Sequence, residues 1–349
     1  MRPTKLLLLA LVLGVAALLA LRLRPAADAT ADPKTALLPA PVLDGARAVT
    51  LTLKPTGKTT TLEKGADGVW TVKEKHGLPA DLENRLVPLF RSLQKAENFG
   101  VLTTNPKRIE KLALDSSLRL VGADGKVTEL TFGKTTDDGL GAAATVADGQ
   151  GGAQAIRTSF TGFLEADPVN WFDPVLFTAK PEELKGLAFT WADGQRSFAR
   201  AEKGKPFAGK EGALLEEMTN VLMTLRANDA VAKGDKDAAA AFAKPWSIQL
   251  ELFDGAKVTL TLAKTAATAP NESPKLWMRV THSDPKHKAN GMTAKAEFIA
   301  PPWLAEQLPA TLADFNKALE PPPAQPGPGA GPTLNIPGLG PVSAPPGVK

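Results

Sequence analysis

Residues 117–134, SLRLVGADGKVTELTFGK, and residues 247–264, SIQLELFDGAKVTLTLAK, decide the fold. Each stretch holds two runs of alternating apolar and polar residues, and a period of two predicts half-buried strands. An Asp-Gly pair, typical of tight hairpin turns, separates the runs at 124–125 and at 254–255. Both stretches therefore predict antiparallel hairpins, and their likeness suggests that the chain contains one unit twice.

Two further passages recur in the same order. Residues 84–93 (NRLVPLFRSL) align with residues 216–225 (EEMTNVLMTL), and residues 160–172 resemble residues 298–315. The offsets between paired passages run from about 130 to 138 residues, as small insertions in loops produce. We therefore predict a tandem duplication.

The first repeat is expected over residues 46–178 and the second over residues 179–319. In each, a strand pair precedes a helix, a short helix, a hairpin, further strands and a closing helix. This order predicts an α+β fold made of a mostly antiparallel sheet with packed helices. The expected strands outside the hairpins lie at 48–54, 59–63, 69–73, 142–147, 153–157, 187–192, 196–201, 276–281 and 294–299, and the short helices at 105–112 and 237–242.

Each repeat carries one longer amphipathic helix. In the first repeat Asp81 is placed to cap the helix, and Pro88 falls inside the pattern, where proline kinks or shortens a helix. The apolar residues share one face in both helices, which predicts that these stripes pack on the core. The stripes are Leu82, Leu86, Leu89, Phe90 and Leu93 in the first repeat and Leu214, Met218, Val221, Leu222 and Leu225 in the second.

An apolar run near the amino terminus predicts a membrane anchor. Arg2 and Lys5 precede the run, which extends over residues 6–21. Its helical length of about 24 Å is slightly short of a hydrocarbon core of about 30 Å. We expect residues 1–24 to form a single transmembrane helix in the bacterial inner membrane and residues 25–45 to form a linker.

The alternative is a cleaved signal peptide, with small-residue cleavage sites at 27–29 and 29–31. Arg22 and Arg24 stand between the apolar run and these sites, where charge is unusual, and this favours the anchor. Both interpretations place the body in the periplasm.

The composition changes at the carboxyl end. Residues 320–349 are rich in proline and glycine and contain almost no helix or strand former, so we expect a disordered tail. A short apolar island at 334–339 (LNIPGL) is the only docking motif in this tail.

The overall composition excludes several kinds of chemistry. The sequence has no Cys, which rules out disulfides, zinc-thiolate sites, iron–sulfur clusters and a cysteine nucleophile. A net charge of +4 is weak, and the basic stretches at 73–75, 107–111 and 286–288 contain acids or lie in expected loops. We therefore expect no binding of nucleic acid.

Two glycine-rich stretches imitate nucleotide-binding loops. Residues 204–211 (GKPFAGKE) match the GxxxxGK spacing, but Glu211 stands where Ser or Thr holds magnesium. The corresponding residues 73–79 of the first repeat contain no such loop. Residues 139–144 (GLGAAA) match GxGxxA but precede an expected strand, so no helix dipole meets a pyrophosphate. We interpret both as ordinary loops.

The remaining candidate ligands are few. His282, Asp284 and His287 suit a metal, yet the proline and lysines among them favour a solvated loop, and His76 is also expected in a loop. The carboxylates at 137–138 fall short of a calcium loop. The sequence therefore predicts no catalytic, cofactor-binding or metal-binding residue, and no cofactor.

The pattern resembles a bacterial family known as domain of unknown function 4340. The resemblance rests on the basic-then-apolar amino terminus, on residues 69–72 (VWTV) before a leucine-striped helix, on residues 112–115 (LALD), and on the hairpin that closes on Gly133. It covers residues 46–319, although members often carry aromatic-Gly-Leu in place of residues 112–114. The resemblance implies a single-pass envelope protein that accompanies an ABC-type transport system akin to gliding-motility components.

Three hypotheses for the function follow. The first is a non-enzymatic, membrane-anchored accessory or scaffold subunit of such a transport system, with transporter subunits as partners. The second is a periplasmic module that binds a glycan or a peptide. The third is an enzyme without a recognisable motif.

Overall fold

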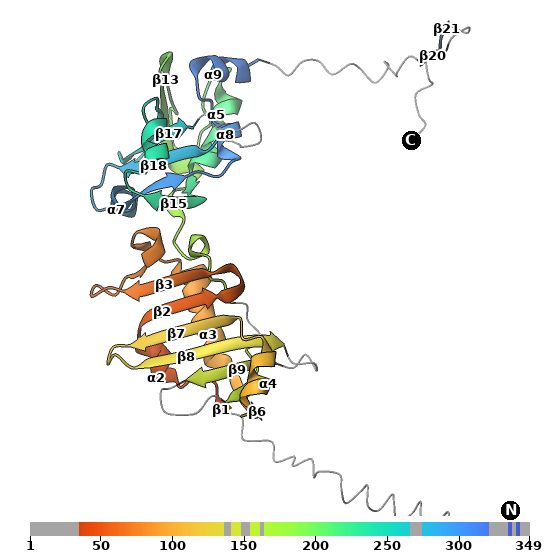
Figure 1. Cartoon of the computed structure of the whole chain (residues 1–349). Coiled ribbons are helices and arrows are strands. Elements are labelled where there is room, and N and C mark those ends of the chain that lie inside the picture. Colours follow the sequence, from red (N-terminus) through yellow and green to blue (C-terminus); the bar gives the residue numbers. More distant parts are fainter. Residues whose placement is uncertain are drawn as a thin grey trace, which may run out of the picture. The chain divides into compact units, whose positions relative to one another are not determined.

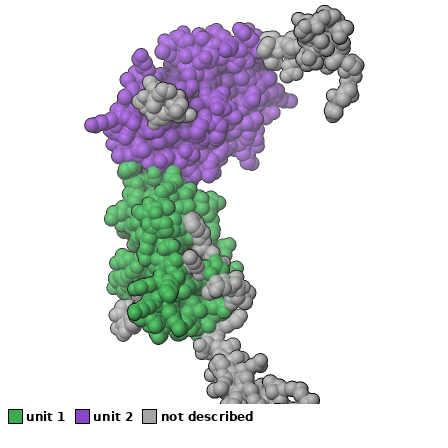
Figure 2. All heavy atoms as spheres, turned by 45° about the vertical axis from the view of Figure 1, so that its right-hand side comes forward, with its two compact units in different colours: residues 1–173 green, residues 174–349 purple. Residues whose placement is uncertain are grey.

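The computed structural model falls into two compact units, residues 1–173 and residues 174–349 (Figure 2). The expected anchor at 1–24 lies outside the described residues. In the part of the chain that is described, no helix is both long enough and apolar enough to cross a bilayer. The described residues are 35–135, 141–147, 154–160, 164–265, 274–320, 334–336 and 340–342.

The core of unit 1 is a single antiparallel sheet (Figure 1). The described part of unit 1 also contains the α-helices α2 (Ala40–Asp44), α3 (Val87–Lys95) and α4 (Pro106–Ile109). Among the described residues ten strands lie in the order β1-β6-β10-β9-β8-β7-β2-β3-β4-β5. Their bounds are β1 (Thr35–Ala36), β2 (Ala46–Leu53), β3 (Lys58–Lys64), β4 (Trp70–Val72), β5 (Leu78–Pro79), β6 (Glu97–Thr103), β7 (Ser116–Gly122), β8 (Val127–Thr135), β9 (Ala142–Ala147) and β10 (Ala155–Thr158).

The sequence alternation explains the sheet of unit 1. Leu118 on β7 pairs with Leu51 on β2 and with Leu130 on β8, and all three side chains are buried. The tight turn between β7 and β8 needs a residue with positive φ, which Gly125 supplies at 77°. The predicted hairpin is therefore confirmed.

Pro88 breaks the first long helix, as predicted. Asp81 accepts a hydrogen bond from the Asn84 backbone N–H, and the helix opens as a π-helix, Leu82–Leu86, before α3 continues it. A proline has no N–H for the normal α-helical bond, so the first turn is wider. The prediction that the stripe packs on the core is wrong for Leu82, which is 38% exposed, whereas Leu86 and Leu93 are buried.

Unit 2 contains a second antiparallel sheet and five α-helices in its described part. The sheet has the order β13-β12-β16-β17-β18-β19-β15, and β11 pairs separately with β14. The strands are β11 (Val175–Thr178), β12 (Leu184–Trp191), β13 (Gly194–Ala199), β14 (Thr224–Arg226), β15 (Asp229–Ala232), β16 (Trp246–Leu252), β17 (Lys257–Lys264), β18 (Leu276–His282) and β19 (Ala296–Ile299). The helices are α5 (Gly212–Leu222), α6 (Lys236–Ala241), α7 (Lys288–Lys295), α8 (Leu304–Gln307) and α9 (Leu312–Ala318).

The two sheets share one strand order. Numbered along the chain, the seven strands of the unit 2 sheet lie in the order 2-1-4-5-6-7-3. Strands β2, β3 and β6 to β10 of unit 1 lie in the same order, with β1, β4 and β5 added at the two edges. The hairpins also share a register, because Leu118 pairs with Leu130 and Ile248 pairs with Leu260 at one constant offset.

Some elements differ from the expectations. The closing helix expected within residues 160–172 is wrong for the described part, which contains only a 3-10 helix, Pro168–Asn170. Asp167 and Pro168 start this short turn, and the Trp171 side chain donates to the Glu165 carbonyl, so the segment is held as a compact loop. In unit 2, α8 and α9 form the closing segment.

Several further elements were not expected. Helix α7 takes up residues 294–295 of the strand expected at 294–299, so β19 begins only at Ala296. The tail contains a small antiparallel pair, β20 (Leu334–Ile336) with β21 (Gly340–Val342). The expectation of a wholly unstructured tail is therefore wrong for these residues. Strand β6 was also not predicted, because its sequence ENFGVLT lacks alternation and includes Gly100 at φ 100°.

Candidate functional site

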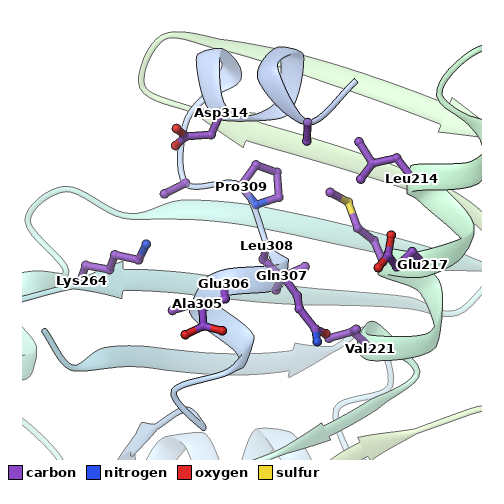
Figure 3. A pocket seen from close by; sticks show the side chains of 13 residues that line it. Leu214, Glu217, Val221, Lys264, Ala305, Glu306, Gln307, Leu308, Pro309 and Asp314 are labelled. Atoms are coloured by element: carbon purple, nitrogen blue, oxygen red, sulfur yellow. The ribbon is translucent and has the colours of Figure 1, made fainter. Parts of the chain in front are cut away.

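A cavity lies within unit 2, between α5 and the segment formed by α8 and α9 (Figure 3). Its volume is about 450 Å³, which falls within the range of roughly 300–1,000 Å³ for ligand pockets. We call it the α5 groove. It is lined by Leu214, Glu217, Met218, Val221, Lys264, Ala305, Glu306, Gln307, Leu308, Pro309, Ala310, Asp314 and Ala318.

The floor of the α5 groove is apolar. Leu214, Met218 and Val221 follow one another at helical spacing along α5, and Leu308 and Pro309 face them from the opposite side (Figure 3). Met218 and Leu308 are buried, whereas Leu214 and Val221 are half-buried. Part of the stripe that is predicted to pack in the core therefore forms the floor of an open groove.

The segment opposite α5 is anchored firmly to the sheet. The Trp191 indole N–H donates to the Pro309 carbonyl at 2.9 Å, and Asp193 accepts from the Leu312 backbone N–H at 3.0 Å. Phe315 of α9 is 1% exposed and packs against Phe189 and other rings of β12 and β13. The groove is therefore preformed.

The rim of the α5 groove carries three carboxylates and one ammonium group. Glu217 lies on α5, while Glu306 and Asp314 lie on α8 and α9 (Figure 3). All three side chains are exposed, and none forms an ion pair with a residue that the structure describes. Lys264 also lines the groove, and its ammonium group lies 5.7 Å from the centre of the Trp246 ring. The lining therefore bears a net negative charge.

Unit 1 has a smaller cavity at the corresponding place, between α3 and the segment after its last strand. Its volume is about 200 Å³. The alignment of residues 84–93 with 216–225 puts Arg85 at the position of Glu217, and Leu89 at that of Val221. This α3 groove is lined by Asn84, Arg85, Pro88, Leu89, Ser92, Phe160, Leu164, Glu165 and Trp171.

The loop at 204–211 does not have the form of a phosphate-binding loop. Phe207 is buried inside it, and its backbone N–H donates to Glu216 at 2.9 Å. The same carboxylate accepts from the Arg200 guanidinium, which lies 4.8 Å from the Phe207 ring. The loop is thus tied to α5 through Glu216.

The histidines of unit 2 form a stacked pair. The rings of His282 and His287 lie 4.2 Å apart and contact Phe177 of β11. The Nδ1 atom of His282 accepts from the Asp284 backbone N–H, and that of His287 accepts from the Ala289 backbone N–H at the start of α7. Burial lowers the pKa of His287, and the neighbouring His282 lowers it further.

The other candidate residues lie apart from the α5 groove. His76 ends a 3-10 turn with φ 58°, in a loop as predicted. Residues 142–147 of the GxGxxA region form β9, whereas residues 137–140 lie outside the described part. Within the described ranges, no group of three or more His, Asp or Glu side chains is arranged to hold a metal ion.

Sequence reasoning missed one buried charged cluster. Glu297 on β19 is 1% exposed and accepts two hydrogen bonds from Arg279, each of 2.7 Å, and it pairs with Lys233 at 3.0 Å. Burial acts to raise the pKa of the Glu297 carboxyl, but the bonds from Arg279 and Lys233 outweigh it and hold that pKa below its usual value. The Arg279 guanidinium also lies 3.8 Å from the centre of the Phe242 ring.

These observations define a class of protein with two antiparallel α+β units and an open groove on the second. The family described as Domain of unknown function (DUF4340) matches residues 70–245, half of the chain, and the chain belongs to that family. The predicted resemblance is thereby confirmed. Comparison with curated proteins and with solved structures gave no match.

Proposed function

We propose that the protein is a membrane-anchored envelope protein that acts as an accessory or scaffold subunit of an ABC-type transport system. In this proposal residues 1–24 hold the chain in the bacterial inner membrane and the two units lie in the periplasm. The apolar run at 6–21 supports the anchor, and the role rests on the association with such systems that the resemblance to the family implies.

We further propose that the two units arose by tandem duplication. The shared strand order and the constant register offset of the two hairpins support this. Each unit also has a cavity between its long helix and the segment after its last strand. A duplicated scaffold offers two similar docking positions with different side chains.

The observation that carries a binding role is the α5 groove. Its apolar floor is open to solvent, its walls are fixed by the Trp191 and Asp193 hydrogen bonds, and its charged rim is exposed. Such a groove suits a partner segment that brings its own apolar side chains. The proposed function involves no chemistry on a substrate.

The test is extraction of the full chain, expressed at its native level, in a mild detergent. We expect transporter subunits to copurify with the wild type, and recovery of the protein alone would overturn the proposal. Val221→Asp, which places a charge on the groove floor, is expected to reduce their recovery. Glu182→Lys, which changes the charge at an exposed site of unit 2 outside the groove lining, serves as the surface control.

A periplasmic binding module is the second candidate, and the groove lining favours a peptide over a glycan. None of the described residues that line the α5 groove is aromatic, whereas sugar rings commonly stack on aromatic faces. A ligand that binds only the folded protein raises its melting temperature. We expect short peptides to raise it more than disaccharides, and the opposite order would exclude the peptide.

A further inference from the structure

We propose that the α5 groove binds a basic, apolar segment of a partner protein, in which leucine-like side chains are flanked by arginine or lysine. This inference rests on the proposed binding role of the groove and specifies the chemistry of its occupant. Three features of unit 2 support it: the floor, the rim and the contrast with unit 1.

The floor requires apolar side chains from the occupant. Leu214 and Val221 are left half-buried on α5, although Leu215 and Leu222 of the same helix are buried. Covering them removes apolar surface from water, which is favourable by about 25 cal/mol per Å². Because Leu308 and Pro309 close the other side, the occupant lies between two apolar walls.

The rim selects the charge of the occupant. Glu217 stands on one side of the groove, and Glu306 and Asp314 stand on the other, so cationic groups on either flank of a bound segment meet a carboxylate (Figure 3). Lys264 is the single base among the described lining residues. The groove is thus negative on a chain whose net charge is +4. This complementarity favours basic partners and speeds their encounter.

The contrast with unit 1 shows that the acidic rim is not a consequence of the fold. Arg85 occupies the position that corresponds to Glu217, and the α3 groove has Glu165 as its one carboxylate among the described lining residues. Two cavities at the same place in the same strand order therefore differ in charge. The acidic rim is a property of the side chains of unit 2 alone.

The direct test uses the full chain in detergent and a short fluorescein-labelled peptide in which two leucines are flanked by arginines. Fluorescence anisotropy measures its affinity, with protein-free micelles as the blank. A peptide with glutamates in place of the arginines tests the charge, and one with serines in place of the leucines tests the floor. We expect both replacements to weaken binding by about tenfold or more, and added salt to weaken the binding of the arginine peptide.

Variants locate the binding. Glu217→Lys with Glu306→Lys reverses the charge on both sides of the groove. Val221→Asp places a charge on the apolar floor and leaves the rim acidic. Each variant is expected to weaken the affinity for the arginine peptide by about tenfold or more. The control, Glu182→Lys with Glu202→Lys, makes the same change of net charge at exposed sites outside the lining and should leave the affinity unchanged. Melting temperatures verify that every variant is folded.

The outcomes separate the inference from the proposed function. Equal affinity of the groove variants and the control, or equal affinity for the glutamate peptide, overturns the inference. If transporter subunits still copurify with Glu217→Lys/Glu306→Lys, the groove is not their binding site, although the accessory role stands. If the arginine peptide binds as expected and no transporter subunit copurifies, the accessory role fails and the chemistry of the groove stands.

Discussion

The two units arrange their strands in the same order but stabilise their sheets differently. In unit 1 the sixth and seventh shared strands, β9 and β10, bring Thr145 opposite Ala155. In unit 2 the corresponding strands, β18 and β19, bring Arg279 against Glu297. The two units therefore have the same strand order, although unit 1 has a neutral pair where unit 2 has an ion pair with a buried carboxylate. The strand order depends on the alternation of apolar residues, and the polar positions are free to diverge.

The largest effect is expected from breaking the ion pair of unit 2. Glu297→Ala leaves the partly exposed Arg279 and Lys233 without their buried partner, and the loss of these charged hydrogen bonds costs about 1.5–3 kcal/mol of unfolding free energy. Chemical denaturation of the variant and the wild type measures it. The double change Arg279→Thr with Glu297→Ala copies the pair found in unit 1 and should cost less than Glu297→Ala alone. A larger loss in the double variant would show that Arg279 stabilises unit 2 through other contacts, such as its contact with the Phe242 ring.

A second difference lies three residues after Leu130 and Leu260 of the paired hairpins. Gly133 of β8 corresponds to Ala263 of β17, which is fully buried. A Cβ atom at Gly133 would collide with the carbonyl oxygen of Leu112, because the short helix of unit 1 approaches the sheet closely there. In unit 2, Ala238 and Ala241 of α6 leave room for Ala263.

Gly133→Ala is therefore expected to destabilise unit 1 by about 1–3 kcal/mol through overpacking. Ala263→Gly in unit 2 should cost about 1 kcal/mol, since it removes one methyl group and adds backbone freedom. Hydrogen exchange on β8 and β17 assigns each loss to its unit. If Gly133→Ala leaves the stability of unit 1 unchanged, the short helix can move away from the sheet without a loss of free energy.

The smallest effect concerns pH and the stacked histidines of unit 2. The fold lowers the pKa of His287 below the value of about 6.5 in an unfolded chain, so the unfolded state binds protons more readily. The free energy of unfolding is therefore unaffected by the titration of this histidine above about pH 6.5. It decreases as the pH falls below that value, because the unfolded state then binds the proton more readily. We expect the melting temperature to decrease from pH 7.5 to pH 5.5, and His287→Asn to reduce this decrease. An asparagine still accepts at the start of α7, which isolates the effect of titration.

Local sequence signals were sufficient for the elements that depend on neighbouring residues. The Asp-Gly turns, the Asp81 cap and the break at Pro88 each follow from the chemistry of a few consecutive residues, and each is present. Helix α7 escaped prediction because its sequence KANGMTAK has no apolar stripe. Its start depends on His287, and Asn290 bonds to the carbonyl of His282 on the preceding strand.

The α5 groove was out of reach of sequence reasoning for a different reason. The stripe on α5 was recognised, but its spacing gives no sign that part of it faces solvent. That exposure depends on Leu308 and Pro309, far along the chain, and on the Trp191 hydrogen bond that fixes their distance from α5. The charged rim likewise joins Glu217 to residues of α8 and α9 only in the folded unit.

The shared hairpin register has a practical consequence. Residues 117–132 and 247–262 have equal lengths, place the Asp-Gly turn at the same point and present their apolar residues to the sheet in the same phase. Either segment can therefore replace the other without inserting or deleting a residue. The hairpin is an exchangeable cassette, and chimaeras built by this swap would reveal which strand neighbours each sheet tolerates.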